Sequence, residues 1–489
     1  MNARPAIIAI VAALAMGLLA WVSLRPPTRT TEGTMLPALP DSAAVHNALV
    51  IRWASGQIEF QRDEASNLWL ATDARGVWPA SSDRVQGALR LLAEHRGLAI
   101  TPAQTGRDES GRDEPSAVLQ LGSTTLELFL PAVGTEGSLR RTDAANQATS
   151  ETSPEVWLRA DRALMALFEP AAVATWLDAS VMPGLGEVRR IELGATDTPD
   201  PAMVLVRRGR AWTLERPLLA PADGERIASM LTTLARTMLT PEPVAVGPRA
   251  STDPESPGAS GESGPGSESL RLRVAGEPSL RPQTQLEYTI EISPGGVGGS
   301  RVSIFGELGA NGSQGQSRTL GPWAGRSEVD LRRVLPQQPG EVASPVALGV
   351  PAADIASIEI TRSGDSTQTR TYRFELSGWI RVDPAANGTA AGTKPLEEAD
   401  ALRQLVEVLC QRRATRVEIQ PGESGQAPGT NGQDFDVVLT PRGAPPGAGL
   451  RVRLTRVSEG LRVRLNDGRV LFYMLTLEER ARMDEVLRT

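Results

Sequence analysis

Cysteine, histidine and lysine are nearly absent from this chain of 489 residues. Cys410 is the only cysteine, so the chain can form neither an internal disulfide framework nor a cysteine zinc site. The two histidines, His46 and His95, lie 49 positions apart, which argues against a histidine-based zinc site. Lys394 is the only lysine, and we interpret the bias toward arginine as the mark of a GC-rich genome.

Aromatic residues are also scarce, at 4% of the chain, whereas hydrophobic residues make up 40%. The net charge is -7, which argues against a nucleic-acid-binding protein that needs a basic face. At about 100–200 residues per domain, the length predicts about two to four domains. The 47 glycines and 37 prolines predict many irregular connections between the elements of those domains.

Residues 6–24 are an uncharged apolar run, AIIAIVAALAMGLLAWVSL. As a helix this run would span ~28 Å, close to the hydrocarbon thickness of a bilayer. Arg25, Pro26 and Pro27 end the run, and Trp21 occupies the position of an interfacial aromatic. These features predict an uncleaved membrane anchor. A cleaved signal peptide is the alternative, but it favours a shorter apolar region and a small-residue cleavage site.

The anchor predicts the topology of the whole chain. Residues 1–5 would be a cytoplasmic tail, 25–45 a linker rich in proline and threonine, and the remainder extracytoplasmic. Because no later segment approaches 18 consecutive apolar residues, everything after Arg25 must lie on one side. The positive-inside count does not decide which side, because Arg4 and the amino terminus nearly balance Arg25 and Arg29. A short N-terminal tail before a large C-terminal body favours a single-pass protein of the inner, cytoplasmic membrane with most of its chain outside the cytoplasm.

A search for internal repeats finds the same order of parts three times, in residues 46–182, 183–346 and 347–489. Each copy opens with two short alternating strands, followed by a tryptophan and then a helix. The first strands read LVIRW from Leu49, VRRIEL from Val188 and IASIEI from Ile355. The tryptophans are Trp69, Trp212 and Trp379.

The helices carry apolar residues at the i, i+3/i+4, i+7 spacing of a helix that packs by one face. The predicted stripes are Val85, Leu89 and Leu92; Ile227, Leu231 and Leu234; and Leu402, Leu405 and Leu409. Asp83 and Asp223 are the expected N-caps, and Pro395 the expected first-turn proline of the third helix. More strands and a second helix complete each copy.

The predicted unit is therefore β-β-Trp-α-β-β-β-α. The expected fold class is α+β, with an N-terminal transmembrane helix followed by three related modules of antiparallel sheet that carry helices on one face. Polar, Gly- and Pro-rich stretches at 134–155, 247–269 and 387–394 fall inside the modules and are predicted to be insertions. The stretch 247–269 is expected to be disordered because its composition cannot form a core.

A search for catalytic motifs finds no nucleophile elbow, no Walker loop and no H-E-x-x-H sequence. Cys410 has no histidine nearby in the third module, so we interpret it as a packed thiol. The pairs Glu397–Glu398 and Glu478–Glu479 stand where the first turns of helices are expected, and the helix dipole accounts for them. We therefore assign no catalytic residue, no metal ligand and no cofactor, and we predict a non-enzymatic protein.

The three tryptophans are the best-supported candidates for residues with a distinct role, because each occupies the equivalent position in its copy. We interpret each as a large apolar side chain that completes the core of its own module. The alternative is that they line a shared groove for a ligand or partner.

The chain resembles the bacterial domain-of-unknown-function family of single-pass, membrane-anchored repeat proteins that are associated with gliding-motility-type ABC transporter subunits. The resemblance rests on VRRIEL, WTLERP and DGERIASMLTTL in the second copy and on IASIEI and WIRVDP in the third. It implies an extracytoplasmic accessory or scaffold protein with a membrane-protein partner of the ABC-transporter type. It supplies no catalytic residues.

The leading hypothesis is thus a non-enzymatic, membrane-anchored accessory or scaffold protein of the cell envelope, bound to the membrane through residues 6–24. One alternative is an envelope hydrolase that works through Asp and Glu carboxylates, which requires an acid and a base that converge in one cleft. A second alternative is a structural spacer that holds a partner away from the membrane.

Overall fold

A computed structural model describes residues 32–34, 47–94, 96–100, 114–130, 136–143, 156–241, 269–278, 284–295, 299–310, 317–363, 365–376, 378–382, 398–420, 433–445 and 447–487. The predicted membrane anchor at residues 6–24 lies outside these described residues. None of the helices within them is long and apolar enough to cross a membrane.

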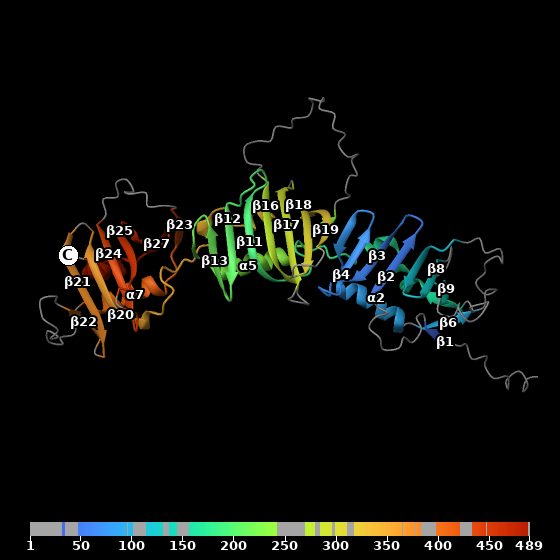
Figure 1. The fold of residues 1–489 in the computed structure, drawn as a ribbon, viewed down its shortest axis with the longest axis horizontal. Helices are drawn as coiled ribbons and strands as arrows, with labels where there is room; N and C mark the ends of the chain where they lie inside the picture. The colour runs from blue at the N-terminus through green and yellow to red at the C-terminus, as the bar shows by residue number, and fades with distance from the viewer. Residues whose placement is uncertain are drawn as a thin grey trace, which may run out of the picture. The chain divides into compact units, whose positions relative to one another are not determined.

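The described residues form three antiparallel sheets of ten, nine and eight strands, drawn in Figure 1 from blue to red along the chain. The first sheet contains β1 (Glu32–Thr34), β2 (Ala48–Trp53), β3 (Gly56–Arg62), β4 (Trp69–Asp73), β5 (Gly76–Pro79), β6 (Arg96–Ile100), β7 (Ala117–Leu121), β8 (Thr124–Phe129), β9 (Glu136–Asp143) and β10 (Val156–Asp161). The second contains β11 (Leu185–Ala195), β12 (Met203–Arg208), β13 (Ala211–Arg216), β14 (Ala220–Pro221), β15 (Thr240–Pro241), β16 (Leu270–Pro278), β17 (Thr284–Pro294), β18 (Ser300–Ala310) and β19 (Arg318–Ser327). The third contains β20 (Ile355–Arg362), β21 (Asp365–Glu375), β22 (Gly378–Val382), β23 (Arg416–Ile419), β24 (Asp434–Pro441), β25 (Leu450–Val457), β26 (Gly460–Leu465) and β27 (Arg469–Met474).

The three sheets share one topology. Each begins with a meander of three strands, β2-β3-β4, β11-β12-β13 or β20-β21-β22. A helix and one short strand follow, and a second meander of four strands pairs with the first strand of the first meander, as in β20–β24. The short strand after the helix, β6, β15 or β23, pairs with the last strand of that second meander. The predicted threefold repeat is therefore present as a repeated sheet architecture.

The helices that follow the first meanders are α2 (Ser82–Glu94), α5 (Gly224–Arg236) and α7 (Ala399–Cys410). Shorter helices are α3 (Arg162–Ala166), α4 (Pro170–Ala174) and α6 (Leu331–Val334), and α8 (Leu477–Leu487) is the last described element. The 3-10 turns η4 (Pro339–Glu341) and η5 (Ala352–Asp354) precede the third sheet.

The cores form between one face of each sheet and its helix. Strand β17 shows the alternation that drives this packing, because Leu286, Tyr288, Ile290 and Ile292 are all fully buried while the residues between them are not. In the third module the α7 stripe Leu402, Leu405 and Leu409 belongs to one hydrophobic cluster with strand residues of β20, β21 and β22. In the second, Met230 of α5 lines a small interior void together with strand residues of β11, β12 and β16.

Most of the predicted helix details are confirmed, two are wrong, and the one at Pro395 is not tested. The stripes of α2 and α7 are buried as predicted, but Leu231 of α5 is only half-buried and Met230 takes its place in the core. Asp223 is the N-cap of α5, with its carboxylate accepting from two backbone N–H groups. Asp83 lies in the first turn of α2 rather than at its N-cap, because the helix begins at Ser82, two residues earlier than expected. Helix α7 begins at Ala399 with Glu398 as its N-cap, and Pro395 lies outside the described residues.

The fold is mainly β rather than the expected balanced α+β, because each unit contains more strands than the sequence pattern predicts. Each tryptophan lies on a third strand of the first meander that the pattern missed. Strand β9 falls inside the stretch 134–155 that was expected to be an insertion, and β1 falls inside the expected linker 25–45. The expected insertions at 247–269 and 387–394 lie, apart from Ser269, outside the described residues.

The chain divides into two compact units, residues 1–178 and 179–489. The second unit holds both the second and the third sheet. In the first unit, the segment after α4 returns to its own sheet, where Leu177 bridges to Ala80 and the backbone N–H of Ser81 donates to the carbonyl of Trp176.

Candidate functional site

The three repeat tryptophans occupy equivalent positions and are all buried. Trp69, Trp212 and Trp379 retain 1%, 9% and 5% of their exposed surface. Trp379 packs edge-on against Phe374, with ring centroids 5.3 Å apart, within the core that α7 covers. A Cβ placed on Gly224, the first residue of α5, would lie 3.9 Å from the Trp212 ring. Trp212 and Trp379 are thus packed where the third strand of the first meander meets the helix of the same module.

The second compact unit contains a junction between its two sheets, made by the segment 342–348. On one side, Ala343 bridges to Ala222, and the backbone N–H of Asp223 donates to the carbonyl of Val342 at 2.7 Å. On the other side, the N–H of Ala414 donates to the carbonyl of Pro345, and the N–H of Leu348 donates to that of Leu409, both at 2.9 Å. One short segment is thus hydrogen-bonded to both modules.

Arg469 holds this segment from within the third module. It is the first residue of β27 and is 3% exposed. Its guanidinium donates to the carbonyls of Ser344, Val346 and Ala347 at 2.8, 3.0 and 3.3 Å, and its Nε lies 2.8 Å from a carboxylate oxygen of Asp467. A buried guanidinium is stable only when its donors are satisfied. The donors of Arg469 are satisfied only while the segment 342–348 stays in place.

A second arginine crosses the junction on its exposed side. Arg413 pairs with the Asp223 carboxylate and, at 2.9 Å, with that of Glu225. Asp223 is 10% exposed at its side chain and also caps α5 through its other carboxylate oxygen. The N-cap of the second module's helix is therefore also the ion-pair partner of the third module.

Two glycines allow the modules to approach this closely. A Cβ on Gly340, in η4, would lie 2.2 Å from the carbonyl oxygen of Val417 on β23. Gly468 has a φ of +83°, and a Cβ there would lie 2.8 Å from the Leu218 side chain of the second module. Larger residues would collide at both positions, so the junction depends on glycine there.

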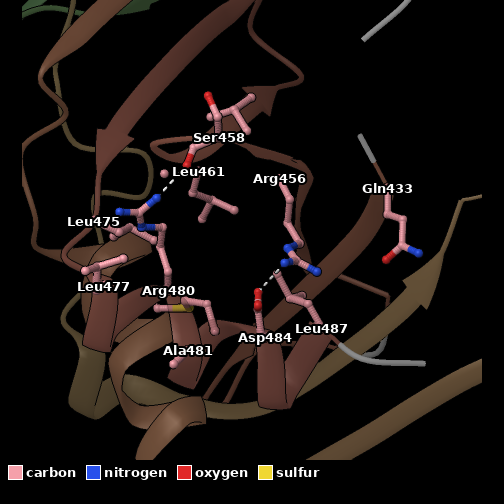
Figure 2. A pocket seen from close by; sticks show the side chains of 13 residues that line it. Gln433, Arg456, Ser458, Leu461, Leu475, Leu477, Arg480, Ala481, Asp484 and Leu487 are labelled. Carbon is pink, nitrogen blue, oxygen red and sulfur yellow. Dashed lines mark hydrogen bonds and ion pairs between the residues drawn. The ribbon is translucent and has the colours of Figure 1, made fainter. Parts of the chain in front are cut away.

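The third module also contains a cavity of about 660 Å³ beside α8, shown in Figure 2. Its inner wall is apolar and includes Leu461, Leu475, Met483 and Leu487. Two arginines frame it: Arg480 donates to the carbonyl of Ser458 at 2.5 Å, and Arg456 pairs with Asp484 at 2.5 Å. Leu477 stands at its rim and is 78% exposed.

The residues that line this cavity do not supply the pair of carboxyl groups that the hydrolase alternative needs. The carboxylate alternative requires an acid and a base that face each other. Among the residues that line the cavity, only Asp484 carries a carboxyl group, and it is paired with Arg456. The Nε of Arg480 is buried without a hydrogen-bond partner among the described residues, so one donor is left at the wall.

The other residues considered from the sequence are accounted for by packing and capping. Cys410 is buried at the end of α7, and burial raises the pKa of its thiol to about 11. Glu398 accepts a 2.9 Å hydrogen bond from the Tyr372 hydroxyl. Glu479 and Thr476 form a reciprocal capping box at the start of α8. His46 and His95 lie outside the described residues.

The pKa values near these carboxylates follow from the same contacts. Burial, with the Glu398 carboxylate beside it, raises the pKa of Tyr372 to about 12. Burial opposes ionisation of Glu479, but the backbone N–H of Thr476 and the Arg412 guanidinium outweigh it and lower the pKa of that carboxyl. Within the described part of the chain, no group of three or more His, Cys, Asp or Glu side chains could hold a metal ion.

No model of a known protein family, no curated protein and no solved structure matched this chain. The junction residues Arg413 and Arg469 were not identified from the sequence. Arg413 stands in an RR pair after α7, and Arg469 follows an Asp-Gly turn signal, but neither pattern indicates a partner more than 100 positions away.

Proposed function

We propose that this protein is a non-enzymatic, membrane-anchored scaffold of the cell envelope, anchored by residues 6–24 with its sheets outside the cytoplasm. The observation that carries the proposal is the junction of the second and third modules. Arg469 is 3% exposed and donates to three carbonyls of the connecting segment. Arg413 of the third module forms ion pairs with Asp223 and Glu225 of the second.

A junction of this kind has a clear mechanical consequence. Moving one module relative to the other would break the backbone bonds that Asp223 and Ser344 make across the junction, or pull the carbonyls of Ser344 and Val346 away from the buried Arg469 guanidinium. A buried polar group that loses its partner costs about 1–3 kcal/mol, and a charged one costs more. Two successive modules therefore behave as one rigid body, which is what a scaffold needs to present surfaces at fixed spacing.

The partner in this proposal is a membrane protein of the ABC-transporter type, or another envelope machine. That part rests on the apolar run at 6–24 and on the sequence resemblance carried by VRRIEL, WTLERP and DGERIASMLTTL. The repeated sheet architecture supports it by supplying several similar faces and edges on one chain.

Co-purification of the full chain from native membranes tests this function. The chain is tagged at its C-terminus, solubilised in several detergents and recovered at low and moderate salt. We expect an ABC-type transporter subunit to be recovered at constant stoichiometry. A chain recovered alone from every detergent would contradict the scaffold proposal. A second chain that keeps only residues 1–45 controls for contacts made only by the anchor.

A further inference from the structure

The outer face of the third sheet, opposite its helices, carries a cluster of arginines. Strands β25, β26 and β23 place five of them on this face: Arg451, Arg453, Arg462, Arg464 and Arg416. We call this cluster, with Phe472 at its centre, the arginine face. Phe472 lies between two of these side chains, with the guanidinium carbons of Arg416 and Arg462 both 5.7 Å from its ring centroid.

Only two of the five arginines have a carboxylate partner within the described residues. Arg453 pairs with Asp436 at 2.9 Å, and Arg416 pairs with Glu418 at 2.6 Å. Arg464 donates to the neutral amide oxygen of Gln420 at 2.7 Å. Arg451 and Arg462 have no carboxylate partner in the part of the chain that is described.

The register brings these charges close together. Arg453 and Arg464 are directly opposite on β25 and β26, and Arg451 is the diagonal neighbour of Arg464. Like charges at directly opposed positions destabilise a sheet. Arg453 is compensated by the Asp436 carboxylate, whose hydrogen bond raises the pKa of its guanidinium. An external anion would therefore contribute most at Arg451, Arg462 and Arg464.

The second sheet shows how the same type of face is neutralised internally. There, Arg273 contacts Glu287 at 2.5 Å and Glu192 at 3.5 Å, and Arg190 also pairs with Glu192 at 2.7 Å. Glutamates on neighbouring strands thus supply the counter-charges. The third sheet makes such pairs at Arg453–Asp436, Arg416–Glu418 and Arg373–Glu375, but it also carries two arginines on β26 that have no carboxylate partner among the described residues.

We propose that the arginine face is a docking surface for a partner protein that presents a cluster of aspartate and glutamate carboxylates. Carboxylates are the groups that satisfy arginines on this face and on that of the second sheet. The surface lies on an open sheet with an aromatic at its centre, and arginine and aromatic residues are enriched in protein interfaces. The inference deepens the scaffold function proposed above and rests on it.

Binding of labelled poly-L-glutamate to the purified full chain, followed by fluorescence anisotropy at several salt concentrations, tests this proposal. The test variant is Arg462→Gln with Arg464→Gln. Since two guanidinium–carboxylate contacts are lost, the affinity should fall by about tenfold at low salt, with a smaller salt dependence. The control is Arg90→Gln with Arg210→Gln, which makes the same charge change at two exposed positions elsewhere. It should leave the affinity unchanged.

The melting temperature shows that the test variant is folded. The double variant gives up the Arg464–Gln420 hydrogen bond and the Arg462–Phe472 contact, but it also removes two like charges, so it should melt close to the wild-type temperature. Absence of poly-L-glutamate binding, or an equal loss of affinity in both variants, would overturn the proposal. Stronger binding to polyphosphate or to phosphatidylglycerol vesicles at equal charge concentration would also overturn it, in favour of a phosphate ligand. These binding measurements do not require recovery of a membrane partner. Failure of the docking proposal can therefore be told apart from failure of the scaffold proposal.

Discussion

Replacing Trp212 by alanine tests whether the repeat tryptophans build the modules or bind a partner. Trp212 lies on β13, is 9% exposed, and sits beside the first turn of α5. If it completes the core of the second module, its loss leaves a large cavity between strand and helix. If it lines a recognition groove, the same change removes binding and leaves stability nearly unchanged.

The size of the effect follows from the buried area. A tryptophan buries roughly 200–250 Å², which at about 25 cal/mol per Å² gives about 5–6 kcal/mol. The unfolded chain already buries part of that surface, which lowers the figure by about 10–40%. The expected loss is therefore about 3–5 kcal/mol, in line with other emptied aromatic sites. That is a large part of the total stability of a typical domain.

Hydrogen exchange resolved by peptide is the best assay, because unfolding of a chain with several modules is not a single two-state transition. Protection should fall in β11–β13 and α5 and stay unchanged in residues 47–178. Leu219→Ala is the control, since Leu219 is 64% exposed and its truncation should change stability by less than about 0.5 kcal/mol. A Trp212→Ala chain with wild-type protection would refute the packing role and favour recognition.

Three further predictions concern the junction, the thiol and the topology. Arg469→Met should lower the protection of the junction by about 3–5 kcal/mol in hydrogen exchange resolved by peptide, because Asp467 and three carbonyls lose their buried partner. A loss below about 1 kcal/mol would contradict the interlocked junction. Burial raises the pKa of Cys410 to about 11, so the thiol should react slowly with iodoacetamide at pH 8. The pKa of Cys410 is higher in the folded chain than in the unfolded chain. The free energy of unfolding that this thiol contributes is therefore fully present below the unfolded-state pKa and is lost as pH rises through about 11. Rapid labelling of the folded chain at pH 8 would contradict the burial of Cys410. Alkaline phosphatase fused after Thr489 should be active in cells, and an inactive fusion paired with an active cytoplasmic reporter would reverse the predicted orientation.

The threefold repeat could be predicted from the sequence because periodicity is local. The helix stripes, the N-cap Asp223 and the strand pairs before each helix all depend on residues within about ten positions of each other. Strands such as β9 and β15 were missed for the converse reason. β15 has only two residues and is fixed by pairing with the distant strand β19. β9 lies in polar sequence and is fixed by pairing with its neighbours β8 and β10 rather than by its own pattern.

The junction and the arginine face could not be predicted for the same physical reason. Arg469 meets Ser344 across 125 positions, and Arg413 meets Asp223 across 190. A single sequence gives the charge of these residues but not their partners. The arginine face is visible only once the register places Arg453 opposite Arg464 and Phe472 between Arg416 and Arg462.

The rigidity of the junction is the central claim, and a spin-label distance measurement tests it most directly. In a Cys410→Ala background, labels are placed at Ser229→Cys on α5 and Glu485→Cys on α8, both exposed positions. Double electron–electron resonance should give one narrow distance distribution, which broadens when Arg469 is replaced by methionine. A broad or multi-peaked distribution in the chain that retains Arg469 would show that the two modules move independently and would contradict the scaffold account.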